Sequence, residues 1–387
     1  MTEDKNMLDK KSNADLFIIA RRGLPAIKHK LLHNVPLNDS ITVAFLGGSI
    51  TEGAGATDAE TSSWRALTGS YLQGRYVNQS FRFINAGVGG TDSTLGAHRL
   101  HEHVLRAGRI DLLFVEFSVN DGNDRDESIR GMEGIVRQCW RLSPETDICF
   151  LYTAAEKNLT GSRPFNIAVH EEVAGHYGIP SVNFAARIYT QIQAGERVWK
   201  ELAPDGYHPN DAGHALYAGF LQKYLETALA SDSMVAHRQE VSSTAPLDSL
   251  NYEYGMMLDG HGADYSEAFE NRELKLGDPL MNWRFSTEHI YSDDPEASFS
   301  FTVTGQGAGL VLLIGPDTGI FEYSVNGSPY TAVNMFDDWC LNAYRPLPAM
   351  FPIRDQREKL HVTVRNTGMK DERSLGSGLR ILKLLCN

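Results

Sequence analysis

The stretch ITVAFLGGSITEGAG, residues 41–55, decides the fold. Its first six residues, Ile41 to Leu46, are all apolar or β-branched, which is the composition of a strand buried on both faces of a parallel sheet. Two glycines follow at once, and glycine permits a sharp turn and a close backbone approach. Ser49 is therefore predicted at the carboxyl end of a central strand, where open α/β sheets bind their ligands. The alternative interpretation is a turn whose serine only caps the next helix.

Strand-like and helix-like segments alternate from Ile41 to about Ala230, and this alternation is typical of a parallel sheet with helices on both faces. The further strands that we predict are Phe81–Asn85, Leu112–Phe117, Ile148–Tyr152 and Ile179–Asn183, and the helices are Trp64–Tyr76, Thr94–Ala107, Glu127–Leu142, Phe165–Tyr177 and Ala212–Ala230.

The pattern changes after Ala230. A mostly polar linker, residues 231–245, leads to residues 246–387, where strand-like pieces are separated by turn signals such as Asn326-Gly327. We predict that this segment is a second domain, an all-β sandwich of the jelly-roll-like kind. Residues 1–40 are predicted to form an N-terminal extension, with a helix or two, that packs on the main domain.

The composition, with 42% hydrophobic and 22% charged residues, is that of a soluble globular protein. A formal net charge of −13 argues against nucleic acid as a partner, because phosphate binding needs clustered Lys and Arg. The N-terminus is polar and charged, and no apolar run approaches the roughly 18 residues of a membrane span. We expect no membrane partner and a cytoplasmic protein, or a secreted one if a leader has been removed. The four cysteines have no spacing typical of zinc or redox motifs.

Three predicted strand ends carry groups that suit acyl transfer. Ser49 follows the first strand, Gly90 the second and Asn120 the third, and these ends are neighbours in a sheet of order 2-1-3-4-5. A tetrahedral intermediate needs fixed hydrogen-bond donors for its oxyanion, and two backbone N–H groups with one side-chain amide are suitable. The hydroxyl also needs a base. The candidate base is His208, which Asp205 could orient from three residues upstream; the alternative is a solvated loop histidine.

Four motifs taken together resemble those of the SGNH, or GDSL-like, hydrolase family. They are Gly-x-Ser-Ile-Thr after the first strand, Asn-x-Gly-x-x-Gly after the second, x-x-Asn-Asp after the third and Asp-x-x-His-Pro-x-x-x-Gly-His before the last helix. The resemblance spans residues 41–230. It implies a flavodoxin-like three-layer α/β/α sandwich, a serine esterase, and no metal or organic cofactor. By position it implies Ser49 as nucleophile, His208 as base, Asp205 as its orienting group, and Ser49, Gly90 and Asn120 as oxyanion donors.

The chain departs from this family at two positions. Gly48 stands where the family usually has Asp, and Ser118 stands where the third motif usually begins with Gly. Glu116 is an unusual residue in an otherwise apolar strand. We hypothesise that Glu116 supplies the missing carboxylate beside the Ser49 turn; the alternative is a strand-edge residue in water.

Several other groups of residues are assigned simpler roles. His98, His101 and His103 are interpreted as a solvated helix face rather than a metal site, and Asp259-Gly260-His261 as a turn. Trp339 either lines a sugar-binding cleft or packs in the sandwich core.

The predicted function is that of a serine ester hydrolase, with a small-molecule or oligosaccharide ester as substrate. A carbohydrate acetyl esterase is favoured by analogy, because SGNH-like enzymes with an accessory β-sandwich often deacetylate carbohydrates. The alternatives are a lipase, lysophospholipase or thioesterase, and a non-catalytic carbohydrate-binding protein. The sequence does not predict the oligomeric state.

Overall fold

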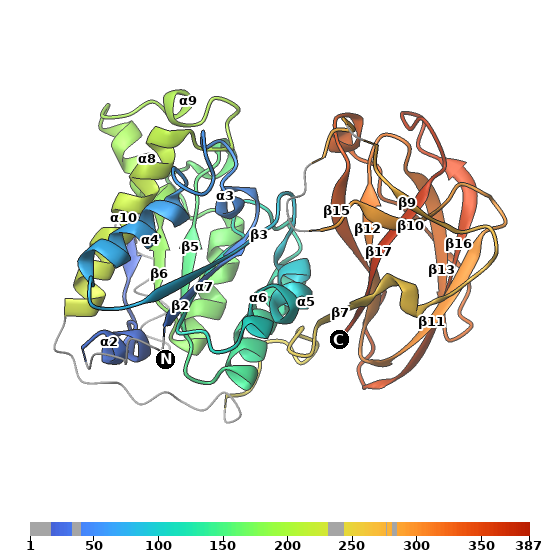
Figure 1. Ribbon diagram of the computed structural model, residues 1–387, viewed down its shortest axis with the longest axis horizontal. Coiled ribbons are helices and arrows are strands. Elements are labelled where there is room, and N and C mark those ends of the chain that lie inside the picture. The colour runs from blue at the N-terminus through green and yellow to red at the C-terminus, as the bar shows by residue number, and fades with distance from the viewer. Residues whose placement is uncertain (1–16, 33–39, 231–243, 276, 281–284) are drawn as a thin grey trace.

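The computed structural model describes residues 17–32, 40–230, 244–275, 277–280 and 285–387. It shows an α/β domain and a β-sandwich side by side (Figure 1). Most of the predicted linker, residues 231–243, and residues 1–16 of the predicted extension lie outside the described residues. Within the described ranges, no helix combines the length and the apolar character needed to cross a bilayer.

The first domain is organised around a six-stranded sheet of order β1-β6-β5-β4-β2-β3. Five strands run parallel, and the predicted order 2-1-3-4-5 is confirmed by β3-β2-β4-β5-β6. The short strand β1 adds an antiparallel edge that the sequence did not predict. The bounds are β1 Ile18–Ile19, β2 Ile41–Gly47, β3 Phe81–Gly87, β4 Leu112–Glu116, β5 Asp147–Tyr152 and β6 Ser181–Asn183.

Helices cover both faces of this sheet, as predicted for three layers (Figure 1). On one side α5, α6 and α7 pack in a row, and on the other α4 packs against α10. Side chains of Ser63, Asp92 and Asp124 cap the N-termini of α4, α5 and α6. The bounds are α2 Pro25–Leu32, α3 Ser49–Glu52, α4 Trp64–Arg75, α5 Ser93–His103, α6 Arg125–Leu142, α7 Phe165–Tyr177, α8 Phe184–Gln193, α9 Trp199–Leu202 and α10 Asp211–Ala230.

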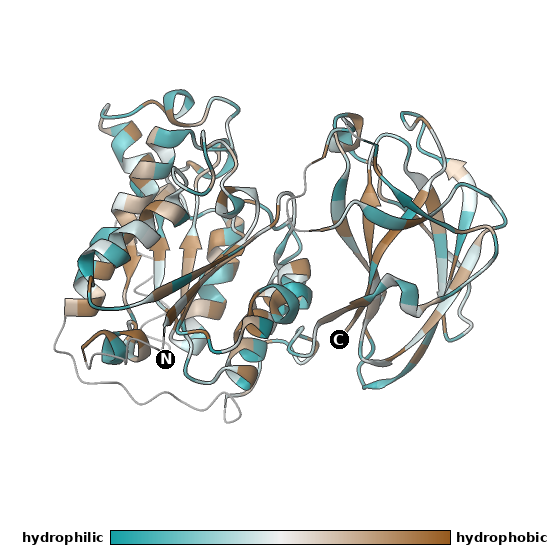
Figure 2. Ribbon diagram, viewed as in Figure 1, coloured by the Kyte–Doolittle hydropathy of each residue, from teal (hydrophilic) through white to brown (hydrophobic). Residues whose placement is uncertain are grey.

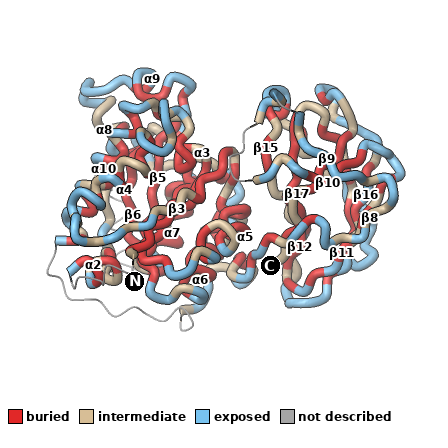
Figure 3. The backbone as a smooth tube through the Cα atoms, viewed as in Figure 1, coloured by how far each residue is buried: buried red, intermediate tan, exposed pale blue. Residues whose placement is uncertain are grey.

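The core of the first domain lies between the sheet and its helices. Strands β2, β4 and β5 are mostly hydrophobic (Figure 2). Every residue of these strands and of β6 is buried (Figure 3). Parallel strands covered on both faces lose the polar alternation of a half-exposed sheet. This explains why residues 41–46 read as one unbroken apolar run.

The second domain consists of two antiparallel sheets that face each other, as predicted. One sheet has the order β15-β12-β17-β10-β9, with β7 also pairing with β17, and the other has the order β14-β13-β16-β11-β8. The bounds are β7 Met256–Asp259, β8 Asp264–Tyr265, β9 Glu270–Glu273, β10 Glu288–Ser292, β11 Ser298–Gly305, β12 Ala308–Ile314, β13 Gly319–Val325, β14 Thr331–Asn334, β15 Arg345–Met350, β16 Glu358–Lys370 and β17 Leu379–Cys386.

The first of these sheets faces the α/β domain, and the second lies on the far side (Figure 1). Helix α5 makes the junction, because Leu95 forms a buried cluster with Met257, Val311 and Leu385 of the sandwich. Lys383 Nζ lies 3.6 Å from Glu102 Oε1 at the same junction. The sandwich therefore packs directly on a helix of the α/β domain.

Residues 244–255 lie in the chain between α10 and the first strand of the sandwich, and they pack on α6. Glu133 accepts hydrogen bonds from the backbone N–H groups of Leu247 and Asp248, and Tyr252 packs its ring against His98 with centroids 4.8 Å apart. His98 is fully buried. Its prediction as part of a solvated helix face was wrong, because this segment covers the outer side of α5.

Candidate active site

The first element of the site is the turn between β2 and α3. Strand β2 ends at Gly47, and α3 begins at Ser49 with Gly48 as its N-cap. Ser49 is thus the first residue of a helix at the carboxyl end of a central strand. The N-cap residue is Gly48 and not Ser49, so the alternative that this serine only caps a helix is wrong. The first N–H groups of a helix lack intrahelical partners, which leaves them available to a ligand.

Ser49 meets His208 across 159 positions of sequence. The Ser49 Oγ lies 2.8 Å from Nε2 of His208. His208 follows α9 in the loop that leads into α10, and the imidazole keeps 21% of its side chain exposed. The distance is that of a hydrogen bond between a nucleophile and its base.

Asp205 holds the other side of the imidazole. Its Oδ2 lies 2.7 Å from His208 Nδ1, while its Oδ1 accepts hydrogen bonds from the backbone N–H groups of Tyr207 and His208, both at 2.8 Å. Partial burial by itself raises the pKa of Asp205, but the two backbone bonds and the His208 ring outweigh it and the pKa is lowered. An ionised carboxylate only accepts hydrogen bonds, so the ring proton is assigned to Nδ1 and Nε2 faces the serine as an acceptor.

The side chain of Asn120 lies beside the Ser49 turn. A Cβ atom on Gly48 would overlap Asn120 Oδ1 and stand 3.1 Å from Nδ2. The amide therefore occupies the space that a larger residue at position 48 would fill. The structure thus brings together the turn and one of the predicted oxyanion donors.

The second predicted donor lies in the loop after β3. The backbone N–H of Val88 donates to Gly47 O at 3.0 Å and ties this loop to the end of β2. Gly90 follows two residues later with a φ of 72°, in the left-handed region that favours glycine. Gly90 itself is half-buried. Strand pairing thus places the Gly90 loop next to the Ser49 turn, as the order of the sheet predicted.

Glu116 lies under the same turn and not at an edge in water. It is 1% exposed and pairs with Gly47 in the sheet register. Its Oε2 accepts from Thr51 Oγ1 at 3.2 Å and its Oε1 from Thr153 Oγ1 at 2.7 Å. Burial raises the pKa of Glu116 to about 7, against the opposing effect of the two threonine hydrogen bonds. A carboxyl group therefore does stand beside the turn, hydrogen-bonded to Thr51, two positions after Ser49.

Arg99 is a supporting residue that the sequence did not reveal. This fully buried arginine of α5 donates from Nη2 to Gly47 O at 2.8 Å and from Nη1 to Ala86 O at 2.5 Å. It thereby joins the carboxyl ends of β2 and β3, directly below the Ser49 and Gly90 loops. A single arginine in a helix carries no spacing signal that could have identified this role.

His214 is a second supporting residue, and the fourth motif did contain it. Its Nδ1 accepts from the Trp64 N–H at 3.2 Å, and its Nε2 donates to Ala54 O at 3.1 Å. Burial lowers its pKa to about 4. The ring thus ties α10 to the start of α4 and to the loop after α3.

Asp121, the last residue of the third motif, connects three elements behind the site. Its carboxylate accepts from Ser93 N and Ser93 Oγ, both at 2.8 Å, and lies 2.8 Å from His170 Nε2. These contacts fix the end of β4 against α5 and α7. Among the described residues, no group of three or more His, Cys, Asp and Glu side chains is placed to hold a metal ion.

Comparison with known proteins agrees with this geometry. Residues 45–216 match the model of the GDSL-like Lipase/Acylhydrolase family. No curated protein matches the chain. Among solved structures, a two-domain esterase active on acetylated mannans, co-crystallised with mannopentaose, superposes with a TM-score of 0.80 at 22% identity, over 97% of this chain and 98% of that one. A second structure with the same description, without the oligosaccharide, gives a TM-score of 0.78 at 22% identity and the same coverage. The folds of both domains and their arrangement are thus shared with these two structures.

Proposed function

We propose that this chain is a serine esterase that removes acetyl groups from a carbohydrate. Residues 45–216 match a family of acylhydrolases, which are carboxylic ester hydrolases. The observation that carries the proposal is the chain of hydrogen bonds from Ser49 through His208 to Asp205, at 2.8 Å and 2.7 Å. This is the arrangement of nucleophile, base and orienting acid that acyl transfer requires.

The reaction proceeds in two halves on Ser49. In the first, Nε2 of His208 takes the hydroxyl proton while Oγ attacks the ester carbonyl carbon. The imidazolium, stabilised by Asp205, then gives that proton to the leaving sugar oxygen, and the acyl group stays on Ser49. In the second half, His208 takes a proton from water, whose oxygen attacks the acyl-enzyme. His208 then returns this proton to Ser49 Oγ as the bond between Oγ and the acyl carbon breaks, which releases the carboxylic acid and restores the serine.

The negative oxygen of each tetrahedral intermediate lies against the Ser49 turn. We assign its donors as the backbone N–H groups of Ser49 and Gly90 and the side-chain amide of Asn120. Such donors contribute most because they are fixed before the reaction starts. The contact of Asn120 with Gly48 and the bond between Val88 and Gly47 supply that fixation.

Two observations support a carbohydrate as the alcohol part of the ester. The esterase that shares both domains is described as active on acetylated mannans. In this chain Trp339 keeps 48% of its surface exposed, so of its two interpretations the core position is wrong. It lies on the turn Asp338–Leu341, next to Asp337, which binds the first residue of β15. An exposed indole is the kind of surface on which a sugar ring stacks.

The test combines covalent labelling with substrate profiling. A fluorophosphonate should label the wild type and leave Ser49→Ala unlabelled, and acetate should be released from acetylated manno-oligosaccharides by the wild type alone. Wild-type protein that is neither labelled nor active on any ester would overturn the proposal in favour of a non-catalytic carbohydrate-binding protein. Faster turnover of p-nitrophenyl octanoate than of p-nitrophenyl acetate would instead indicate a lipase or thioesterase.

A further inference from the structure

The loop that carries Gly90 has few means of holding its own conformation. Gly89 and Gly90 have no side chains to pack, and Gly90 is in the left-handed region with a φ of 72°. On the side of the α/β domain, Thr91 bonds back to Val88 O at 2.8 Å, and Arg99 lies 3.5 Å from the Thr91 hydroxyl. These contacts fix the two ends of the turn. The orientation of the Gly90 peptide also depends on what lies against its other side.

That other side is covered by Arg345, a residue of the second domain. Its Cδ lies 3.5 Å and its Nε 3.8 Å from the place where a Cβ atom on Gly90 would stand. Arg345 is the first residue of β15, in the sheet that faces the α/β domain (Figure 1). It is only 3% exposed. A side chain of the sandwich therefore packs against the candidate oxyanion loop.

Arg345 is itself firmly held within the sandwich. Its Nη2 forms an ion pair with Asp337 Oδ2, and its Nη1 lies 3.8 Å from Cys340 Sγ. The other carboxylate oxygen of Asp337 accepts from the N–H groups of Trp339 and Cys340 at 2.9 Å and 3.2 Å. The strand β15 is paired with β12 along its whole length. The guanidinium thus has a fixed position relative to the sheet.

We propose that Arg345 is a positioning residue for ester hydrolysis: it presses on the Gly90 loop and holds the Gly90 N–H in the orientation that the oxyanion needs. The inference rests on the proposed function. It makes the second domain part of the chemistry on every ester, including one too small to touch a sugar-binding surface. A donor contributes to catalysis only when its direction is fixed before the reaction, and a pair of glycines cannot supply that fixation alone.

The decisive substrate is p-nitrophenyl acetate, which has no carbohydrate part. Removing an oxyanion donor outright reduces turnover roughly 10²–10³-fold, so loosening one in Arg345→Ala should reduce kcat by about 10-fold. The KM should stay within about 2-fold, because the contact acts on the transition state and not on ground-state binding. Arg345→Lys keeps the stem that touches Gly90 and should recover most of the lost kcat. Asp337→Asn, which weakens the anchor, should fall between them.

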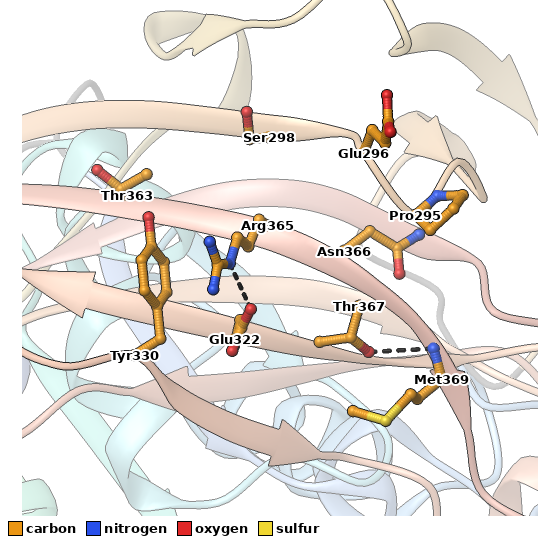
Figure 4. A pocket seen from close by; sticks show the side chains of 10 residues that line it. All are labelled: Pro295, Glu296, Ser298, Glu322, Tyr330, Thr363, Arg365, Asn366, Thr367 and Met369. Carbon is orange, nitrogen blue, oxygen red and sulfur yellow. Dashed lines mark hydrogen bonds and ion pairs between the residues drawn. The ribbon is translucent and has the colours of Figure 1, made fainter.

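A misfolded fraction would also lower kcat without changing KM, so turnover must be expressed per active site. The endpoint of fluorophosphonate labelling counts the sites with a competent Ser49, and kcat is divided by that number. The matched control is Arg365→Ala. Arg365 also lies in a sandwich strand and also pairs with a carboxylate, that of Glu322, but it lines an open trough on the far sheet beside Tyr330 (Figure 4). Its removal should leave kcat unchanged.

The outcomes separate this inference from the proposed function. An active wild type whose kcat per labelled site is equal in Arg345→Ala would overturn the positioning role and leave the esterase intact. A wild type without labelling or turnover would overturn the esterase itself. A loss in Arg345→Ala that Arg345→Lys does not recover, with an equal loss in Arg365→Ala, would indicate general damage to the sandwich and would also reject the positioning role.

Discussion

The amide of Asn120 fills the space beside Gly48, where a Cβ atom would overlap its Oδ1. The contact shows how closely the loop after β4 packs on the turn between β2 and α3. In this structure the Asn120 amide leaves no room for a Cβ atom at position 48. The chain has a glycine there and has its buried carboxyl group, Glu116, below the turn instead.

We expect Gly48→Ala to reduce kcat roughly 10²–10³-fold, as the loss of one oxyanion donor does. The added methyl group must displace the Asn120 amide, while Ser49, His208 and Asp205 keep their contacts. Turnover of p-nitrophenyl acetate measures the loss, and Asn120→Ala should match it. Gly219→Ala is the control, because a Cβ atom there meets nothing within 4 Å. Unchanged turnover in Gly48→Ala would show that Asn120 is not a donor.

Asp205→Asn should reduce kcat by roughly 10²–10⁴-fold, because the amide favours the wrong tautomer of His208. With an N–H₂ group facing Nδ1, the ring proton moves to Nε2. Protonated Nε2 then faces Ser49 and cannot accept the proton of the hydroxyl group. Asp259→Asn is a matched control, since Asp259 lies 3.1 Å from the ring of His261 in an exposed turn of the sandwich. Equal activity in the two variants would reject Asp205 as the orienting group.

Glu116→Gln should change how stability depends on pH. The folded-state pKa of Glu116 is raised to about 7 from an ordinary 4.5, so the folded protein holds this proton better than the unfolded chain. Wild-type stability therefore falls as pH rises from about 4.5 to 7, by about 3 kcal/mol for this group. Glutamine does not ionise and avoids that loss.

Urea unfolding of the wild type and of Glu116→Gln at pH 5 and pH 8 measures the effect. The free energy of unfolding of the variant, relative to wild type, should rise between the two pH values. Glu296→Gln, a change at an exposed position in the sandwich, should show no such trend. If the free energies of unfolding of wild type and Glu116→Gln differ by the same amount at both pH values, and turnover is unchanged, Glu116 does not support the Ser49 turn.

His214 should give the opposite pH dependence. Burial lowers its folded-state pKa to about 4 from 6.5, so the stability that neutral His214 provides is complete above pH 6.5 and is lost as pH falls towards 4, by about 3 kcal/mol. Protonation at Nδ1 removes the acceptor of the Trp64 N–H. His214→Gln should be less stable than wild type at pH 7.5, and the gap should narrow at pH 4.5. His361→Gln, a change at an exposed histidine, is the reference variant. A difference in the free energy of unfolding between wild type and His214→Gln that does not change with pH would contradict this role.

The α/β domain was predicted well because its central strands have a clear sequence pattern. Strands β2, β4 and β5 are apolar and buried on both faces, and polar groups follow directly at their ends. Helix bounds agree within a few residues where a cap such as Ser63 marks the start. Parallel order then followed from alternation, and with it the meeting of Ser49 and Asn120.

The sandwich was predicted less completely for reasons visible in its strands. Every residue of Glu270–Glu273 is exposed and polar, so β9 has no buried apolar face to mark it as a strand. Strand β15 contains Pro346 and Pro348, and proline argues against strand in a sequence. It can be tolerated here because β15 lies at the edge of its sheet.

Contacts between the domains could not be predicted at all. His98 was expected in water because the segment that covers it, residues 244–255, is far away in the sequence. Arg345 was not noticed because its contact with Gly90 depends on how the sandwich docks on the α/β domain. No local pattern encodes that docking. It emerges only when Leu95 meets Met257, Val311 and Leu385.

Helix α5 connects the β-sandwich to the carboxyl end of β2. Its Leu95 is embedded in the sandwich junction, and one turn further on its Arg99 grips the carbonyl of Gly47, the last residue of β2. Bending one domain against the other would therefore strain the backbone that leads into the nucleophile. The turn that carries Ser49 is thus connected to the sandwich through this single helix.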